Sequence, residues 1–174
     1  EVGYEGNLPH CWGNLTAEEL TRRSWEAVIR GGYCGHSETY LSDDNLIWWC
    51  HGSALKGQSA ERFGFLLDFL KDVPGGGLKE GPQRDNIHFQ WDDKIAVPED
   101  DQYAGTWYFY YFSLWRPAFR QIYIDDTTWY DAEIIDTWNM EVIPAGRHKG
   151  KYELELPGRQ YIGVRLKKCA DQGD

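Results

Sequence analysis

A run of three glycines, Gly75–Gly77, divides the chain of 174 residues into two parts with different hydrophobic periodicities. Before this run, apolar residues recur at intervals of three and four, which is typical of amphipathic helices. After about residue 86, short segments alternate apolar and polar residues, as half-buried β-strands do. Apolar residues that recur every three or four positions cannot all lie on one face of a β-strand, so the two patterns indicate two different kinds of structure. We therefore predict a first unit over 1–74, a linker over 75–85 and a second unit over 86–169.

The first unit has the pattern strand, helix, strand, helix. Thr16 followed three residues later by Glu19 is a capping box, which predicts a helix start. The small, apolar segment 31–38 is typical of a buried parallel strand. A second helix is predicted from Ser59, as its N-cap, to Val73, before a proline and the glycines. That helix is apolar on both faces, so we expect it to lie between two structures.

Two parallel strands by themselves would leave unpaired backbone groups along an open edge. The first unit makes sense as the closing quarter of a (β/α)8 barrel. In the second unit, about seven short strands separated by turn residues favour an antiparallel β-sandwich. The predicted fold class is therefore α+β, a partial (β/α)8-barrel segment followed by an antiparallel β-sandwich. The open edge and the uncovered helix face also predict self-association.

Composition excludes several classes of partner. The formal net charge is −10 and the basic residues are scattered, so we expect no binding to nucleic acid. No apolar run is long enough to span a membrane and no signal peptide is evident, so no membrane partner is expected. The cysteines lack zinc-ligand spacing, and we predict no metal or organic cofactor. Unpaired thiols favour a reducing, cytoplasmic location.

Aromatic residues are abundant, with nine Trp and eleven Tyr. Such residues fill large cores, and exposed ones also suit sugar rings. Alternation along one predicted strand gives two aromatic faces, one with Trp107, Phe109 and Tyr111 and the other with Tyr108, Tyr110 and Phe112. We expect the outer face to pack against the first unit, although an exposed face would bind carbohydrate instead. Trp138 is predicted to fill the sandwich core, beside a turn tied by Asp136 or Asn139.

Several segments carry a resemblance to bacterial apiosidase-like glycoside hydrolases. They are EVGYEGNLPHCWGNLTAEEL (1–20), GGYCGHSETY (31–40), IWWCHG (47–52), YDAEIIDTWNMEVIP (130–144) and GKYELELPGRQYIGVRL (150–166). The first three resemble the last two barrel strands of that family, and the last two resemble its C-terminal β-sandwich. The resemblance implies that the chain is the C-terminal part of such an enzyme. It would then be completed by an N-terminal barrel segment of the same protein.

The resemblance also implies a mechanism and a nucleophile. In this family and the larger clan of retaining barrels, the seventh strand ends in a glutamate nucleophile and the fourth supplies the acid/base. Glu1 occupies the position that matches the strand-seven glutamate. Strands one to six have no counterpart in this sequence, so the chain alone is expected to lack the partner carboxylate and to be inactive. The substrate would be a carbohydrate with an O-glycosidic bond.

Further candidate residues lie near the same strand ends, each with a structural alternative. Glu5 is a second candidate nucleophile, a sugar-hydroxyl acceptor or a loop brace. His36 is either a ligand-binding imidazole or a structural histidine, and Glu38 either reaches substrate or pairs with His36. Trp12 and Trp48 are candidate platforms for a sugar ring. The alternative reading of the whole chain is a non-catalytic carbohydrate-binding or structural β-sandwich module.

Overall fold

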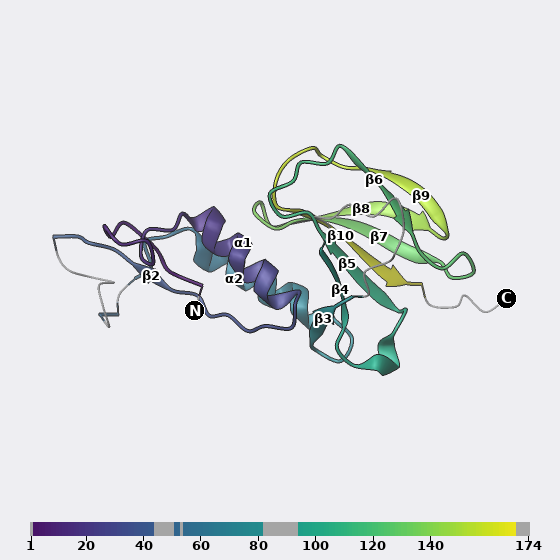
Figure 1. The fold of residues 1–174 in the computed structure, drawn as a ribbon, viewed down its shortest axis with the longest axis horizontal. Helices are drawn as coiled ribbons and strands as arrows, with labels where there is room; N and C mark the ends of the chain where they lie inside the picture. Colours follow the sequence, from purple (N-terminus) through teal and green to yellow (C-terminus); the bar gives the residue numbers. More distant parts are fainter. Residues whose placement is uncertain (1, 44–50, 53, 82–93, 170–174) are drawn as a thin grey trace.

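The computed structural model of the protein describes residues 2–43, 51–52, 54–81 and 94–169. Two helices, α1 (Ala17–Val28) and α2 (Ser59–Lys71), lie between a small parallel sheet and a larger β-structure (Figure 1). In the part of the chain that the structure describes, neither helix is long and apolar enough to cross a membrane.

The two helices begin differently. At α1 the Thr16 side chain accepts a hydrogen bond from the backbone N–H of Glu19 (3.2 Å), which confirms the predicted N-cap. At α2 the prediction is wrong by one residue, because Gln58 is the cap and makes no side-chain capping bond. Ser59 is instead the first helical residue. Its hydroxyl is directed to Glu5, so another segment caps this helix.

The small sheet consists of β1 (Glu5–Gly6) and β2 (Glu38–Thr39), which pair in parallel with Glu5 opposite Glu38. Of the strand predicted over 31–38, only its last residue takes part in this ladder. A β-strand is defined by its backbone hydrogen bonds to a neighbouring strand. Among the described residues, this segment has such a neighbour only at its end. Whether the pair belongs to a (β/α)8 barrel stays a prediction.

The larger β-structure is built from two antiparallel sheets that pack face to face. The first sheet has the order β3-β4-β5-β10-β7-β8 and the second pairs β6 with β9. The strands are β3 (Leu78–Glu80), β4 (Lys94–Pro98), β5 (Trp107–Tyr111), β6 (Phe119–Tyr123), β7 (Tyr130–Asp136), β8 (Glu141–His148), β9 (Lys151–Glu155) and β10 (Ile162–Lys168). A 3-10 turn (Asp101–Tyr103) precedes β5. The molecule is thus β-rich with two helices. Strand β3 lies within the segment predicted to be a linker, and the domain division stays a prediction.

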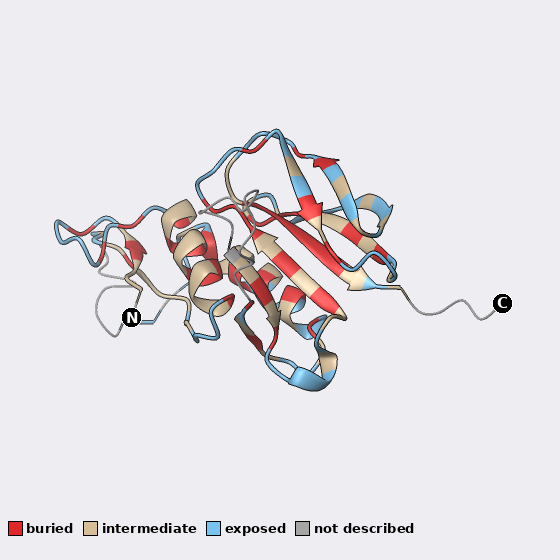
Figure 2. Cartoon of the chain, turned by 45° about the vertical axis from the view of Figure 1, so that its right-hand side comes forward, coloured by how far each residue is buried: buried red, intermediate tan, exposed pale blue. Residues whose placement is uncertain are grey.

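The central strands of the six-stranded sheet are covered on both faces, as Figure 2 shows by the buried residues along them, whereas β8 at the edge is largely exposed. On one face Trp107, Phe109 and Tyr111 form a single core with Trp25 of α1 and Phe69 of α2. The opposite face packs on β6 and β9 through a second core. The prediction that one aromatic face of β5 packs against the first unit is confirmed. The alternative is a carbohydrate-binding face formed by Trp107, Tyr108, Tyr110, Tyr111 and Trp115. The structure contradicts it at Trp107 and Tyr111, which are buried, whereas Trp115 is exposed.

The turn after β7 ties the sandwich through Asp136. Its buried carboxylate accepts hydrogen bonds from the backbone N–H groups of Trp138 (3.1 Å) and Asn139 (2.8 Å) and pairs with Arg159 (2.5 Å). The tie predicted at this turn is therefore confirmed. Trp138 itself is not in the core: it is half-buried, with the Arg62 guanidinium of α2 4.2 Å above its ring centre. The face of its ring is therefore occupied by an arginine of α2 and not by the apolar side chains of the sandwich core.

Replacing Asp136 by Ala is expected to lower the free energy of unfolding by about 2–4 kcal/mol, because two backbone amides and an arginine lose a buried, charged acceptor. Urea denaturation measures the difference. Asp126→Ala, at an exposed turn position, is the matched control and should stay within about 0.5 kcal/mol of the unsubstituted chain. An equally small effect at Asp136 would contradict the role assigned to this turn.

Candidate functional site

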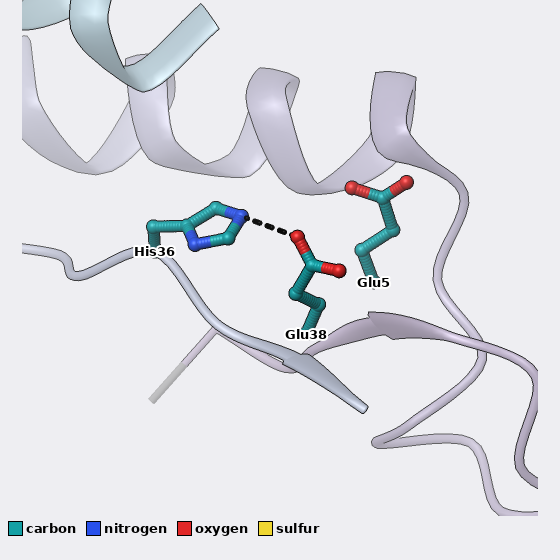
Figure 3. A group of neighbouring side chains, drawn as sticks. All are labelled: Glu5, His36 and Glu38. Carbon is teal, nitrogen blue, oxygen red and sulfur yellow. Dashed lines mark ion pairs between the residues drawn. The ribbon is translucent and has the colours of Figure 1, made fainter. Parts of the chain in front are cut away.

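Three of the predicted site residues meet beside the small parallel sheet. Glu5 of β1, Glu38 of β2 and His36 each offer a ligand atom, and these atoms all lie within 4.8 Å of one another. Figure 3 shows the His36 ring and the Glu38 carboxylate directed at one another, with the Glu5 carboxylate beside them. The register explains the meeting, because residues opposite each other in a ladder project to the same face.

The Glu5 carboxylate is 5% exposed and caps helix α2. It accepts hydrogen bonds from the backbone N–H groups of Gln58 (2.8 Å) and Ser59 (2.9 Å), and from the Ser59 and Tyr40 hydroxyls. The first amides of a helix have no partner within the helix and carry a partial positive charge. A Cβ at Gly57 would overlap the Glu5 carboxylate. A larger residue there would therefore displace this carboxylate from the start of α2.

Glu38 binds the loop that leads into α2. Its Oε2 accepts from the backbone N–H groups of Lys56 (2.8 Å) and Gly57 (2.9 Å), and its Oε1 lies 3.5 Å from Nε2 of His36. The same Nε2 lies 3.1 Å from the Ser59 hydroxyl. The Glu38 side chain is only 1% exposed. The two glutamates and the histidine thus join both strands to the start of α2.

The environment keeps Glu5 ionised. Burial by itself would raise the pKa of this carboxyl group, but hydrogen bonds from the Ser59 hydroxyl, the Gln58 and Ser59 amides and the Tyr40 hydroxyl outweigh it, and the net pKa is lowered. Burial raises the pKa of Tyr40 strongly, and the nearby charge of Glu5 adds to this effect. The site therefore holds a fixed negative charge beside a neutral phenol.

These contacts bear on the alternatives that the sequence leaves open. Each oxygen of Glu5 already accepts two hydrogen bonds, which favours the brace over the sugar-hydroxyl acceptor. For Glu38, the geometry favours pairing with His36. Three of the four carboxylate oxygens already accept hydrogen bonds from amides and hydroxyls, and the start of α2 repels positive charge, which disfavours a divalent cation here. Oε1 of Glu38 is the buried carboxylate oxygen of this group that has no hydrogen-bond partner among the described residues.

Of the remaining predicted site residues, the structure describes Trp12, which is not a member of this cluster. Trp12 is exposed in the loop after β1, where His10 stacks against it with ring centres 5.9 Å apart and Tyr4 packs edge-on at 5.6 Å. Its exposure agrees with a platform for a ring-shaped ligand, which stays a prediction. Glu1 and Trp48 lie outside the described residues.

Sequence reasoning missed Tyr40, Gly57 and Ser59 as members of this cluster. The signal that could have found Gly57 and Ser59 was the stretch before the second helix, where a glycine precedes a weak capping residue. Such a helix start needs an acceptor from elsewhere in the chain. The sequence carries no comparable signal for Tyr40, because its contact with Glu5 depends on the parallel register.

Glu5→Gln is expected to lower the free energy of unfolding by about 1–3 kcal/mol at neutral pH, because an amide cannot accept from all four donors. Since the folded pKa of Glu5 is lowered, its contribution is fully present above the unfolded pKa of about 4.3 and is lost as pH falls through the lower folded value. The difference between the two proteins should therefore shrink on acidification. Denaturation curves from about pH 6 to pH 3 measure it.

Glu61→Gln provides the matched control for this prediction, because Glu61 is an exposed residue in the first turn of the same helix. Its effect should stay within about 0.5 kcal/mol at every pH. A pH-independent difference for Glu5→Gln would contradict the role of the ionised carboxylate.

Comparison with known proteins gives one family match. Residues 91–167 match a family described as a domain of unknown function, DUF5605. This segment spans β4 to β10 without the helices. No curated protein matches the chain.

Solved structures resemble the chain over nearly its full length. One is a protein from Bacteroides vulgatus ATCC 8482, provisionally described as a glycoside hydrolase, with TM-score 0.80 and 23% identity over 97% of this chain and 35% of that one. Another from the same organism is described as a family 5 glycoside hydrolase, with TM-score 0.59 and 12% identity over 92% of this chain and 37% of that one. The chain thus has a fold found in parts of glycoside hydrolase structures, and it spans about a third of their length.

Proposed function

We propose that the chain is the C-terminal part of a retaining glycoside hydrolase that cleaves O-glycosidic bonds, with Glu1 as its nucleophile. The observation that carries the proposal is the likeness to a structure described as a glycoside hydrolase over 97% of the chain, with TM-score 0.80. The parallel pairing of β1 and β2 and the helices that follow them support a place at the end of a (β/α)8 barrel.

The backbone just after Glu1 is well anchored, which suits a nucleophile that must be held in place. The Val2 carbonyl accepts from Arg23 (2.9 Å), the Tyr4 amide donates to the Trp12 carbonyl (2.8 Å), and the Glu5 side chain is fixed to α2. In this proposal Glu5, His36 and Glu38 hold the rim of the substrate site rigid. Trp12 and Trp48 would stack against sugar rings.

Retaining hydrolysis needs two carboxyl groups about 5–5.5 Å apart. In the proposed reaction Glu1 attacks the anomeric carbon while a second carboxyl group, from a segment outside this chain, protonates the departing oxygen. A covalent glycosyl-enzyme forms, and water then releases the sugar with the second group acting as base. The chain alone would then be inactive. Free thiols at Cys11, Cys34 and Cys169 support a reducing compartment, and we place the protein in the cytoplasm.

A second candidate function is a non-catalytic carbohydrate-binding module. The observation that favours it is the exposed side of the β6–β9 sheet, where Phe119 and Gln121 face solvent opposite Glu155 and Glu153. An exposed ring beside polar side chains suits a neutral sugar. Binding of an oligosaccharide to the chain, lost in Phe119→Ala, would support this candidate.

Activity on a panel of aryl glycosides tests the first proposal. Two proteins are compared, the chain of residues 1–174 and the longest polypeptide that its gene encodes. We expect the longer polypeptide to release the aryl group with retention at the anomeric carbon and the chain alone to be inactive. Inversion of the configuration at the anomeric carbon, or equal activity of the two proteins, would contradict the proposal.

A further inference from the structure

Four charged side chains along helix α1 are joined by hydrogen bonds and ion pairs, and we call them the charge row: Glu19, Arg22, Arg23 and Glu26. The Glu19 carboxylate accepts from Nη2 of Arg22 (2.7 Å) and from Nε of Arg23 (2.7 Å). Nη1 of Arg22 in turn lies 2.8 Å from Oε1 of Glu26. Residues three and four apart share one face of a helix, so these contacts by themselves indicate only a stabilised helix.

The two ends of the charge row leave the helix. At one end the Ser113 hydroxyl, in the loop after β5, donates to Oε1 of Glu26 (2.6 Å). At the other end Nη1 of Arg23 donates to the Val2 carbonyl (2.9 Å). Val2 is the residue that follows Glu1 in the sequence. The charge row therefore joins a loop of the β-sandwich to the backbone beside the proposed nucleophile.

The sandwich fixes the position of Ser113. This residue is buried and has φ +53°, in the left-handed region that a residue other than glycine adopts at a cost. The Tyr161 amide donates to the Ser113 carbonyl (2.8 Å), and Tyr161 has φ +64°. The Tyr161 carbonyl accepts from the Thr137 amide (2.9 Å). Strain of this kind persists only where the surrounding structure imposes it, so the hydroxyl is presented to Glu26 from a fixed point.

The arginines of the charge row are suited to passing on a position. Each of them bridges two acceptors: Arg22 binds Glu19 and Glu26, and Arg23 binds Glu19 and the Val2 carbonyl. A guanidinium is a rigid, planar fork, so a shift of one acceptor moves the other. The hydrogen bonds from Arg22 lower the pKa of Glu19 to about 2. The central carboxylate thus stays charged at neutral pH.

We propose that the β-sandwich positions the backbone beside the nucleophile through the charge row, with Ser113 and Arg23 as positioning residues. The inference rests on the proposed function for the role of Glu1, and it deepens that function by giving the sandwich a part in the reaction. Neither positioning residue contacts substrate in this account. Their effect is on rate, because a reacting group misplaced by about 1 Å can lose a hundredfold in rate.

Hydrogen exchange of the Tyr4 amide, measured in the chain of residues 1–174, tests the connection. This amide donates to the Trp12 carbonyl (2.8 Å) and lies two residues from Val2. We expect Arg23→Met and Ser113→Gly each to speed its exchange by about tenfold, and the double variant to add nothing further. Ser113→Gly removes the hydroxyl and also relieves the left-handed strain, so it should fold.

Two controls separate this effect from a loss of stability. The Val164 amide, in the completely buried middle of β10, should keep its exchange rate in both variants, because global unfolding would speed it as well. Arg30→Met, at an exposed position just after α1, should leave the Tyr4 amide unchanged. Unchanged Tyr4 exchange in Ser113→Gly, or equal acceleration at Val164, would overturn the proposal.

Steady-state kinetics of the longest polypeptide that the gene encodes, on an activated aryl glycoside, test the effect on the reaction. We expect kcat to fall by about tenfold in Arg23→Met and about threefold in Ser113→Gly, with KM unchanged and the double variant no slower than Arg23→Met. Unchanged kcat with a lower melting temperature would reduce the charge row to a structural role and overturn the proposal. Selective Tyr4 exchange in a polypeptide that hydrolyses no glycoside would support the connection and overturn the proposed function.

Discussion

Glu1→Gln in the longest polypeptide that the gene encodes is expected to lower kcat/KM on an activated aryl glycoside by about a thousandfold or more. A glutamine side chain is nearly the same size as glutamate but cannot form the glycosyl ester on which retaining hydrolysis depends. The loss should fall mainly on kcat, because sugar binding does not require the attacking oxygen. Steady-state rates over a range of substrate concentrations separate the two parameters.

Two variants control this prediction. Glu61→Gln makes the same chemical change at an exposed position of α2 and should leave the rates unchanged. Glu5→Gln removes the other candidate nucleophile, and in our account it lowers stability while leaving measurable activity below its melting temperature. A fully active Glu1→Gln protein together with an inactive, folded Glu5→Gln protein would transfer the nucleophile role to Glu5.

Trp25→Ala is expected to lower the free energy of unfolding by about 3–5 kcal/mol. Trp25 is completely buried, and its ring centre lies 4.8 Å from that of Phe69 and 5.6 Å from that of Phe109. Its removal would leave a cavity where α1, α2 and the six-stranded sheet meet. Chemical denaturation followed by circular dichroism measures the change.

Trp115→Ala is the matched control, because Trp115 is an exposed residue in the loop after β5. It should change stability by no more than about 0.5 kcal/mol. The Trp25 variant should also unfold in a single transition, since helices and sheet share one core. Loss of the helices while the sandwich stayed folded would contradict that shared core.

Much of the fold follows from local patterns in the sequence. The capping box at Thr16 places the start of α1 correctly, because the cap is made by residues three apart. Alternation along Trp107–Tyr111 predicts that the strand has two aromatic faces and that one of them meets the first unit, and the structure shows which face that is. The tie at Asp136 is equally local, because its amide partners lie two and three residues ahead.

Features that depend on distant parts of the chain could not be predicted. The start of α2 is shifted because its acceptor is Glu5, more than fifty residues earlier in the chain. Trp138 packs against the guanidinium of Arg62 of α2, which also donates a hydrogen bond to the Trp138 carbonyl. The sequence of the sandwich alone does not indicate this contact. The candidate site was predicted as a set of strand-end residues, and the structure brings Glu5, His36 and Glu38 together through the parallel register. Their role as braces becomes evident only from the hydrogen bonds that the backbone amides before and at the start of α2 donate to Glu5 and Glu38.

The most direct test of the central claim is to trap the covalent intermediate on Glu1. The longest polypeptide that the gene encodes is incubated with 2-deoxy-2-fluoro glycosyl fluorides, in which the electron-withdrawing fluorine slows breakdown of the glycosyl-enzyme. Mass spectrometry of a digest then locates the label. Our account predicts one added fluorosugar on the peptide that contains Glu1, and none in the Glu1→Gln variant. A label on a different carboxylate, or hydrolysis with no label at all, would contradict it.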